Sequence, residues 1–80
     1  MSELAKNILA SGERYHQFIF DCNDKDALHT AAQEILVEAM IGKVNPILAM
    51  SVDDDINGRL RHIFPIIEHS HSMIPNYMIL

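Results

Sequence analysis

Histidine and carboxylate side chains gather toward the C-terminal end of this chain, and they are residue types that bind transition metals. His62 is followed one heptad later by the run Glu68, His69, Ser70 and His71. Imidazole and carboxylate donors suit zinc or nickel. Two histidine ligands on one helix usually stand four residues apart, whereas His69 and His71 stand two apart, as in a strand or turn. One hypothesis is therefore a metal- or ligand-binding module built on His62, Glu68, His69 and His71.

A second group of possible metal ligands is the acidic run Asp53–Asp55. The run opens a D-x-D-x-N-G pattern like the start of a calcium loop. The Glu that such a loop needs six residues after its glycine is replaced by Phe64. The three acids also suit the first turn of a helix that begins near Ser51, where negative charge opposes the helix dipole. We expect an ordinary acidic helix start here rather than a calcium site.

No catalytic signature accompanies these residues. Cys22 is the single cysteine, and the sequence around it lacks a recognisable oxyanion-hole loop. The three glycines, Gly12, Gly42 and Gly58, are isolated, so they form no phosphate-binding loop. We therefore expect a protein that is not an enzyme and that needs no cofactor.

The charge balance of the chain restricts its partners. Eleven acidic and six basic residues give a formal net charge of −5, and the basic residues are scattered. This balance argues against binding to nucleic-acid phosphates and to anionic lipid surfaces. An alternative function that uses the charge is an acidic mimic or inhibitor of a nucleic-acid-handling protein, with Asp53–Asp55, Glu34 and Glu38 as its negative surface.

The apolar content is high for a chain of this length. The 80 residues make one domain, 1–80, and 49% of them are hydrophobic. A domain this small buries only about 60–65% of the surface that its unfolded chain exposes. Apolar residues that do not fit into one small core must lie on the surface or meet another chain. We therefore expect a homo-oligomer or an obligate protein partner.

Targeting signals are not recognisable in the sequence. The first residues, MSELAKNILASGE, lack the basic start and long apolar run of a signal peptide. No apolar run approaches the length needed to cross a bilayer. With one cysteine and no internal disulfide, the expected compartment is the reducing cytoplasm.

The elements that would position these residues are helices. Residues 24–42 make the best-delimited one, with Asn23 or Asp24 to cap its start and Gly42 suited to the left-handed residue after its end. Its main apolar face consists of Leu28, Ala31, Ala32, Ile35, Leu36 and Ala39. Val37, Met40 and Ile41 fall on other faces, so this helix must be covered on more than one side.

Two further helices are predicted on either side of the central one. The first covers residues 2–11. The last begins with Asn45 as a cap and Pro46 in the first position, and it either continues or restarts at Ser51. It must stop or kink at Pro65, which lacks a backbone donor. Its apolar stripe is Val52, Ile56, Leu60, Ile63 and Phe64.

Residues 15–22, YHQFIFDC, fit two structures. As a helix they continue the apolar stripe that starts at Leu4, so one rule explains residues 4–22. As a strand they have suitable aromatic and β-branched content, and the strand would pair with the C-terminal NYMIL or with its copy in a dimer. We predict an all-α domain of about three helices plus an apolar C-terminal segment, with an α+β fold as the alternative.

These features favour a small non-enzymatic interaction protein, a regulator, inhibitor or adaptor that acts through an apolar helical surface. Its partner is expected to be another protein, a second copy of itself, or both. The predicted interface combines the off-face residues of the central helix with apolar residues of the tail: Val37, Met40, Ile41, Ile74, Tyr77, Met78 and Leu80.

Overall fold

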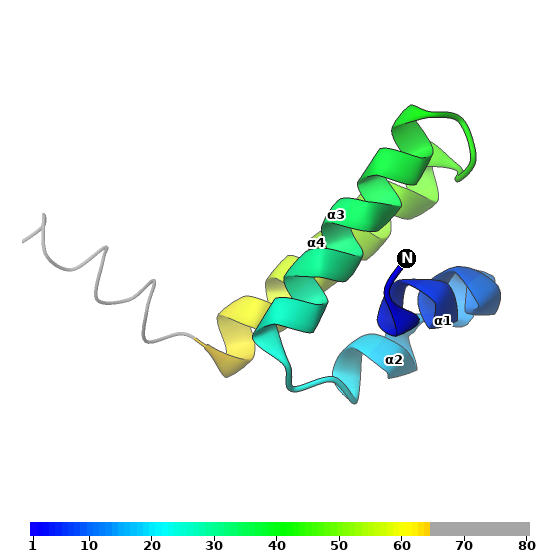
Figure 1. Ribbon diagram of the computed structural model, residues 1–80. Helices are drawn as coiled ribbons and strands as arrows, with labels where there is room; N and C mark the ends of the chain where they lie inside the picture. Colours follow the sequence, from blue (N-terminus) through cyan, green and yellow to red (C-terminus); the bar gives the residue numbers. More distant parts are fainter. Residues whose placement is uncertain (65–80) are drawn as a thin grey trace, which may run out of the picture.

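The protein is all-helical over residues 1–64, the part of the chain that the computed structural model describes (Figure 1). The elements are α1 (Glu3–Ser11), a 3-10 turn (Gly12–Arg14), α2 (His16–Phe20), α3 (Lys25–Met40) and α4 (Pro46–Ile63). The all-α prediction is confirmed, with a short α2 in addition to the three expected helices. The strand alternative for residues 15–22 is wrong, because α2 occupies most of this segment and no strand occurs within residues 1–64.

Each of the three longer helices begins at a residue whose side chain caps it. The side-chain oxygens of Ser2, Asp24 and Asn45 accept hydrogen bonds from backbone N–H groups two or three residues further on, at 3.3, 3.1 and 2.8 Å. These bonds satisfy donors that have no partner inside the helix. Pro46 follows its cap in the first position of α4, where its missing N–H has no cost. The predicted cap at Asn45 is therefore confirmed, and of the two residues predicted to cap α3, Asn23 and Asp24, it is Asp24 that does so.

The connection between α3 and α4 is a tight turn. Gly42 lies there with a φ of +81°, a conformation that favours glycine because it has no Cβ. The prediction that Gly42 ends the central helix is confirmed, since α3 stops at Met40.

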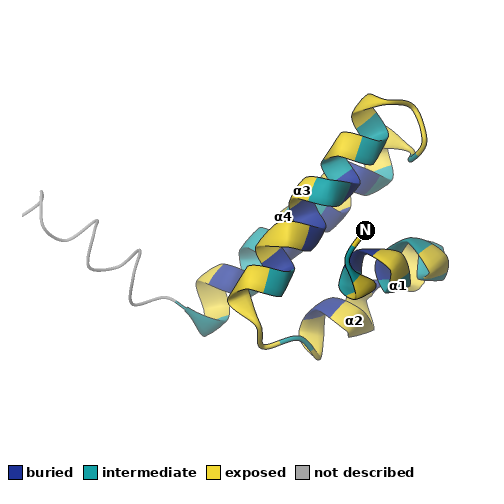
Figure 2. Ribbon diagram, viewed as in Figure 1, coloured by how far each residue is buried: buried dark blue, intermediate teal, exposed yellow. Residues whose placement is uncertain are grey.

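Helices α3 and α4 lie side by side and antiparallel, forming what we refer to as the α3–α4 hairpin (Figure 1). Helix α1 packs on α3 and α2 packs on α4, so that α1 and α2 both lie on one side of the hairpin. The buried positions face one another across these contacts (Figure 2). They are Ala5, Ile8, Tyr15, Ile19, Leu28, Ala31, Ala32, Ile35, Ala49, Val52, Ile56 and Leu60.

Helix α4 is a single helix that passes through Ser51 without interruption. The acidic run Asp53–Asp55 therefore lies in the middle of α4, and its predicted place in a first turn is wrong. A calcium loop is not formed there, because Gly58 is also inside the helix. The physical reason is that extending a helix adds a hydrogen bond per residue, whereas restarting one requires a new and unfavourable nucleus.

Helix α4 ends at Ile63, just before Pro65, as the sequence predicts. The predicted interface residues Ile74, Tyr77, Met78 and Leu80 lie outside the described residues, as does the rest of the apolar C-terminal segment. Within the described part of the chain, no helix combines the length and the apolar character needed to span a bilayer.

Candidate functional site

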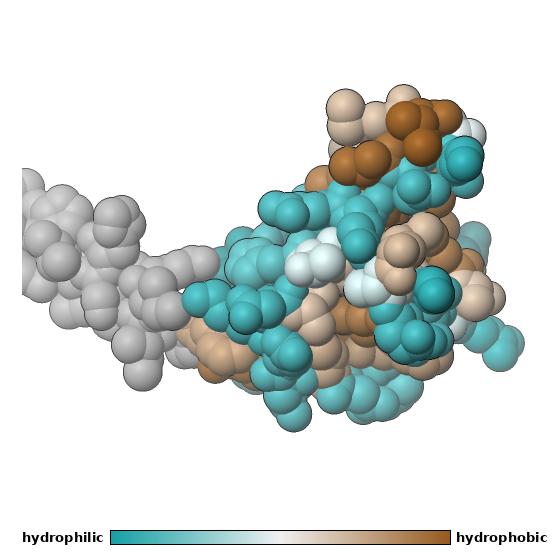
Figure 3. All heavy atoms as spheres, viewed as in Figure 1, coloured by the Kyte–Doolittle hydropathy of each residue, from teal (hydrophilic) through white to brown (hydrophobic). Residues whose placement is uncertain are grey.

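Five apolar side chains at the connected end of the α3–α4 hairpin are more than half exposed. The exposed fractions are 52% for Val37, 83% for Met40, 58% for Ile41, 78% for Ile47 and 62% for Met50. We define these five residues as the apolar end. Figure 3 shows strongly hydrophobic residues gathered over this part of the hairpin. Single exposed apolar residues are ordinary on protein surfaces, but a group of this kind marks a site of interaction.

Helix geometry explains why these side chains point away from the core. Val37 lies two residues beyond the buried Ile35, and hence about 200° round α3 from it. Ile47 lies two residues before the buried Ala49, which gives the same rotation on α4. The residues that fill the core therefore force their near neighbours outward on both helices.

An apolar groove of about 360 Å³ runs between α3 and α4 beside Met40 and Met50, whereas Val37 and Ile47 border other grooves. Its lining consists of Leu36, Ala39, Met40, Pro46, Ala49 and Met50. Because Ala39 and Ala49 are small, the surface is hollow between the longer side chains of Met40 and Met50. The groove has no charged residue in its lining, so it suits an apolar side chain of a partner.

The hairpin end is also neutral in an otherwise acidic chain. Residues 36–50 contain one acid, Glu38, and one base, Lys43, so their net charge is zero, whereas the whole chain carries −5. Residues 36–50 therefore do not attract phosphates or strongly basic surfaces electrostatically.

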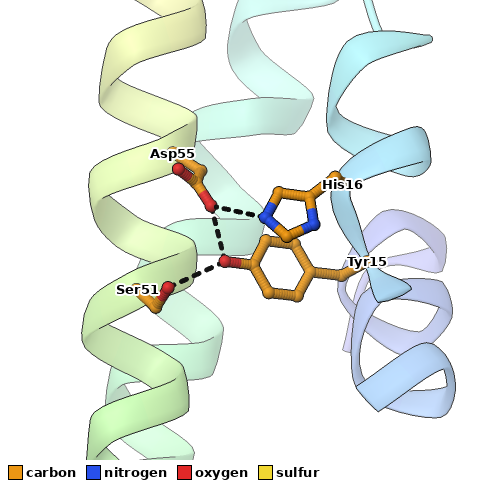
Figure 4. Close-up of polar contacts among 4 residues, drawn as sticks. All are labelled: Tyr15, His16, Ser51 and Asp55. Carbon is orange, nitrogen blue, oxygen red and sulfur yellow. Dashed lines mark hydrogen bonds and ion pairs between the residues drawn. The ribbon is translucent and has the colours of Figure 1, made fainter. Parts of the chain in front are cut away.

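A polar cluster joins α2 to α4 on the side of the hairpin that α1 and α2 cover (Figure 4). The Tyr15 hydroxyl donates a hydrogen bond to Asp55 Oδ2 at 2.5 Å and lies 2.9 Å from Ser51 Oγ. A phenol has one proton, so the Ser51 hydroxyl must donate to Tyr15. His16 Nε2 lies 3.3 Å from the same Asp55 oxygen, and the His16 ring stacks on Tyr15.

The polar cluster connects the α2 region to α4 through a buried tyrosine. The Tyr15 side chain is only 2% exposed. Burial raises the pKa of Tyr15 above its ordinary value, and the hydrogen bond to Asp55 raises it further. The protonated phenol donates its hydrogen bond to Asp55. The cluster therefore holds α2 against α4.

A second groove, of about 260 Å³, lies beside the cluster between α2 and α4, and His62 is part of its wall. The other residues of the wall are His16, Ile19, Phe20, Asp54, Asp55, Gly58 and Arg59. Within residues 1–64, no three histidine, cysteine or carboxylate side chains are placed to hold a metal ion. The predicted ligands Glu68, His69 and His71 lie outside the described residues. The metal-site hypothesis therefore stays a prediction.

The acidic residues of the alternative function point in several directions. Consecutive residues on a helix are about 100° apart, so Asp53–Asp55 spread around α4. Asp55 is already bound by Tyr15, and Glu34 accepts a hydrogen bond from the Ser2 backbone N–H at 2.8 Å. That hydrogen bond lowers the pKa of Glu34. An acidic binding surface stays a prediction that these intramolecular contacts do not favour.

Val37, Met40 and Ile41, which the helical spacing predicts to lie off the main apolar face, are all exposed. The exposure of Ile47 and Met50 is not among these predictions. The helical spacing predicts their exposure once α4 is taken to begin at Pro46. In that helix, Ile47 and Met50 do not lie on the same face as the buried residues Val52 and Ile56.

Comparisons with known proteins give no further guidance on the site. The chain matches no protein-family model, no curated protein and no solved structure. The interpretation of the site therefore depends on the geometry and chemistry of the described residues.

Proposed function

We propose that this protein is a small non-enzymatic interaction protein, a regulator, inhibitor or adaptor that binds a protein through the apolar end. The observation that supports this proposal is the group of five apolar side chains that are more than half exposed at one end of the hairpin. Fully burying a side chain of this kind is worth about 1.5–3 kcal/mol, so covering the group supplies a substantial driving force. Methionine, which contributes Met40 and Met50, is enriched at protein interfaces.

The chemistry of the apolar end also favours a protein over other partners. A nucleic acid or an anionic membrane attracts clustered basic residues, and residues 36–50 contain only Lys43. An apolar protein surface requires no charge of this kind. We propose that the protein acts in the cytoplasm. Its single cysteine, Cys22, cannot form a disulfide within the chain, so the fold does not depend on an oxidising compartment.

The proposal is tested with two variants that add the same charge to α3. Met40→Glu places a carboxylate in the apolar end, whereas Thr30→Glu places one at an exposed position about 15 Å away along the helix. The wild type and both variants are immobilised as full chains and compared for binding to a native extract and to the free chain. We expect Met40→Glu to weaken binding at least about tenfold, because a charge buried without a partner is costly.

Thr30→Glu is expected to bind like the wild type. Circular dichroism of each variant shows whether its helices are intact, and Met40→Glu should keep them because its side chain faces solvent. If Met40→Glu unfolds the chain, Met40 belongs to the core and the proposal is wrong. Equal binding by Met40→Glu and the wild type would also contradict it.

A further inference from the structure

We infer that the groove between α2 and α4 binds a small monocarboxylate with an apolar body, and that Arg59 holds the carboxylate. We refer to it as the α2–α4 groove. Its wall contains no residue of the apolar end, so the inference goes beyond the proposed function and does not depend on it. It combines three properties of this wall: a cation without an anionic partner, apolar side chains, and open space at a glycine.

Arg59 is a partly buried cation that forms no ion pair within residues 1–64. The carboxylate four residues before it, Asp55, is bound by Tyr15 and His16 instead (Figure 4). A charge that is taken partly out of water loses hydration, and an opposite charge normally compensates it. The ligand that completes the surroundings of Arg59 is therefore an anion.

The guanidinium of Arg59 also has hydrogen-bond donors that are not used. Arginine carries five N–H groups, and the one hydrogen bond that this side chain donates within residues 1–64 runs from Nη2 to Asn23 Oδ1 at 2.8 Å. Its Nε is buried and has no acceptor among the described residues. Because a buried donor without an acceptor is costly, an incoming acceptor is favoured. A carboxylate matches the planar fork of a guanidinium and accepts two of its N–H groups at once.

The rest of the α2–α4 groove favours an apolar body beside that carboxylate. Ile19 and Phe20 of α2 line the groove, and Phe20 is 62% exposed. On α4, Gly58 stands next to Arg59, and a Cβ built at this glycine meets nothing within 4 Å. A glycine inside a helix destabilises it relative to alanine, and no close packing requires one here. Its effect is to leave room in the wall for a ligand.

The size and charge of the wall restrict the ligand further. The volume of about 260 Å³ is below the usual range for drug-sized ligands, so it suits a body of about one ring. Asp54 and Asp55 also line the groove, and their charges repel a second anionic group. His62, three residues after Arg59 and on the same side of α4, offers a further N–H donor. A monocarboxylate therefore fits better than a phosphate monoester or a dicarboxylate.

The test compares three small probes on the full, ¹⁵N-labelled chain by NMR. Phenylacetate should bind with a dissociation constant in the millimolar range or below, as expected for so small a ligand, and should shift the amide signal of Gly58 but not that of Met40. Phenylacetamide has the same shape without the charge and should bind at least about tenfold more weakly. Phenyl phosphate, with about two negative charges, should also bind more weakly than phenylacetate.

Three variants assign the binding to the α2–α4 groove. Arg59→Gln should weaken phenylacetate binding at least about tenfold, whereas Arg61→Gln removes the same charge from an exposed position outside the groove wall and should leave binding unchanged. Gly58→Leu keeps the guanidinium but fills the groove, so it should abolish binding. Leucine favours the helix, so circular dichroism should show that α4 is intact in Gly58→Leu.

Each outcome decides the inference. Weaker binding in Arg59→Gln and Gly58→Leu, but not in Arg61→Gln, supports it. Equal binding of phenylacetate and phenylacetamide, or no binding up to tens of millimolar, overturns it. Residues 65–80 contain one acid, Glu68, and binding that is seen only in Glu68→Gln would assign the anion to the chain itself and also overturn it. The comparison of Met40→Glu with Thr30→Glu tests the proposed function separately.

Discussion

At the scale of single residues, Tyr15 has two structural roles, because a tyrosine carries both an apolar ring and a polar hydroxyl group. Its ring fills the core between α2 and α4, while its hydroxyl reaches Ser51 and Asp55 near the surface. Glu34 has a comparable role at the other short helix, where it accepts the Ser2 backbone N–H. These contacts attach the α1 and α2 region to the hairpin, so they are expected to affect stability rather than binding.

Removing the Tyr15 hydroxyl should destabilise the fold. Tyr15→Phe keeps the ring but leaves Ser51 and Asp55 without their common partner, which should lower the free energy of unfolding by about 1–2 kcal/mol. Ser51→Ala removes only one of the two hydrogen bonds and should cost less. Urea unfolding at pH 7 measures both effects. A Tyr15→Phe chain as stable as the wild type would show that the hydroxyl contacts do not stabilise the fold.

The same residue predicts a loss of stability in alkali. The pKa of Tyr15 is raised above its ordinary value of 10.0, so above pH 10 the unfolded chain loses a proton that the folded chain keeps. The contribution of Tyr15 is therefore complete below pH 10 and is lost as pH rises through the raised pKa, by at most about 1.4 kcal/mol per pH unit. The stability difference between the wild type and Tyr15→Phe should narrow between pH 7 and pH 11. An unchanged difference would contradict this assignment.

Glu34 predicts the opposite dependence in acid. Its pKa is lowered from 4.5 by the hydrogen bond from Ser2, so its contribution is present above pH 4.5 and is lost as pH falls through the lowered pKa. Glu34→Gln keeps a hydrogen-bond acceptor but removes the charge. The variant should unfold at a lower urea concentration than the wild type at pH 7, and the two should converge near pH 2. Equal midpoints at pH 7 would count against the Ser2–Glu34 contact.

At the scale of elements, helix caps and buried helix faces could be predicted, because they depend on residues that are close together in the sequence. The caps at Asp24 and Asn45 follow from local signals, and so does the burial of Val52, Ile56 and Leu60 on α4. Ile63 and Phe64, predicted for the same stripe, are only partly buried. The error at Ser51 arose because a Ser followed by acids is typical of a helix start, although a helix was already under way from Pro46. A local start signal has no effect when continuing the existing helix is more favourable.

Two glycines provide a matched test of these elements. Gly58 lies inside α4 with a negative φ and nothing within 4 Å of an added Cβ, so Gly58→Ala should stabilise the chain by about 0.8–1 kcal/mol. Gly42 has a φ of +81°, so Gly42→Ala should destabilise it by about 1–2 kcal/mol. Thermal unfolding should shift by about 4–8 °C per kcal/mol in these opposite directions. Shifts of the same sign would contradict the helix and turn assignments.

At the scale of the whole molecule, residues 1–64 bury twelve apolar residues in one small core and leave others exposed, five of them at the apolar end. The composition and helix spacing predicted that apolar residues would be left outside the core, with Val37, Met40 and Ile41 among them. That Ile47 and Met50 join them at one end of the molecule depends on how α3 and α4 pair across the turn at Gly42. The contact of Tyr15 with Asp55, 40 residues away in the sequence, also depends on how the helices pack, so local spacing does not predict it.

Salt separates binding through the apolar end from binding through an acidic surface. Raising the salt concentration from about 0.05 to 0.5 M screens charges but leaves apolar contacts in place. Self-association through the neutral residues 36–50 should therefore be unchanged or strengthened, because the repulsion between copies with a charge of −5 is screened. Sedimentation at both salt concentrations measures this. Association that collapses in high salt would favour the acidic residues instead.

The most direct test of the central claim, that the apolar end is a binding surface, is the solvent accessibility of Met40 and Met50 methyl groups. The chain is labelled with ¹³C on methionine and alanine methyl groups, and NMR relaxation by a soluble paramagnetic agent is measured in dilute and concentrated samples and after adding any captured partner. Ala27, at the far end of α3, serves as the reference. We predict that Met40 and Met50 become protected while Ala27 does not. If both methionines stay fully accessible in the assembled state, the apolar end is not the binding surface.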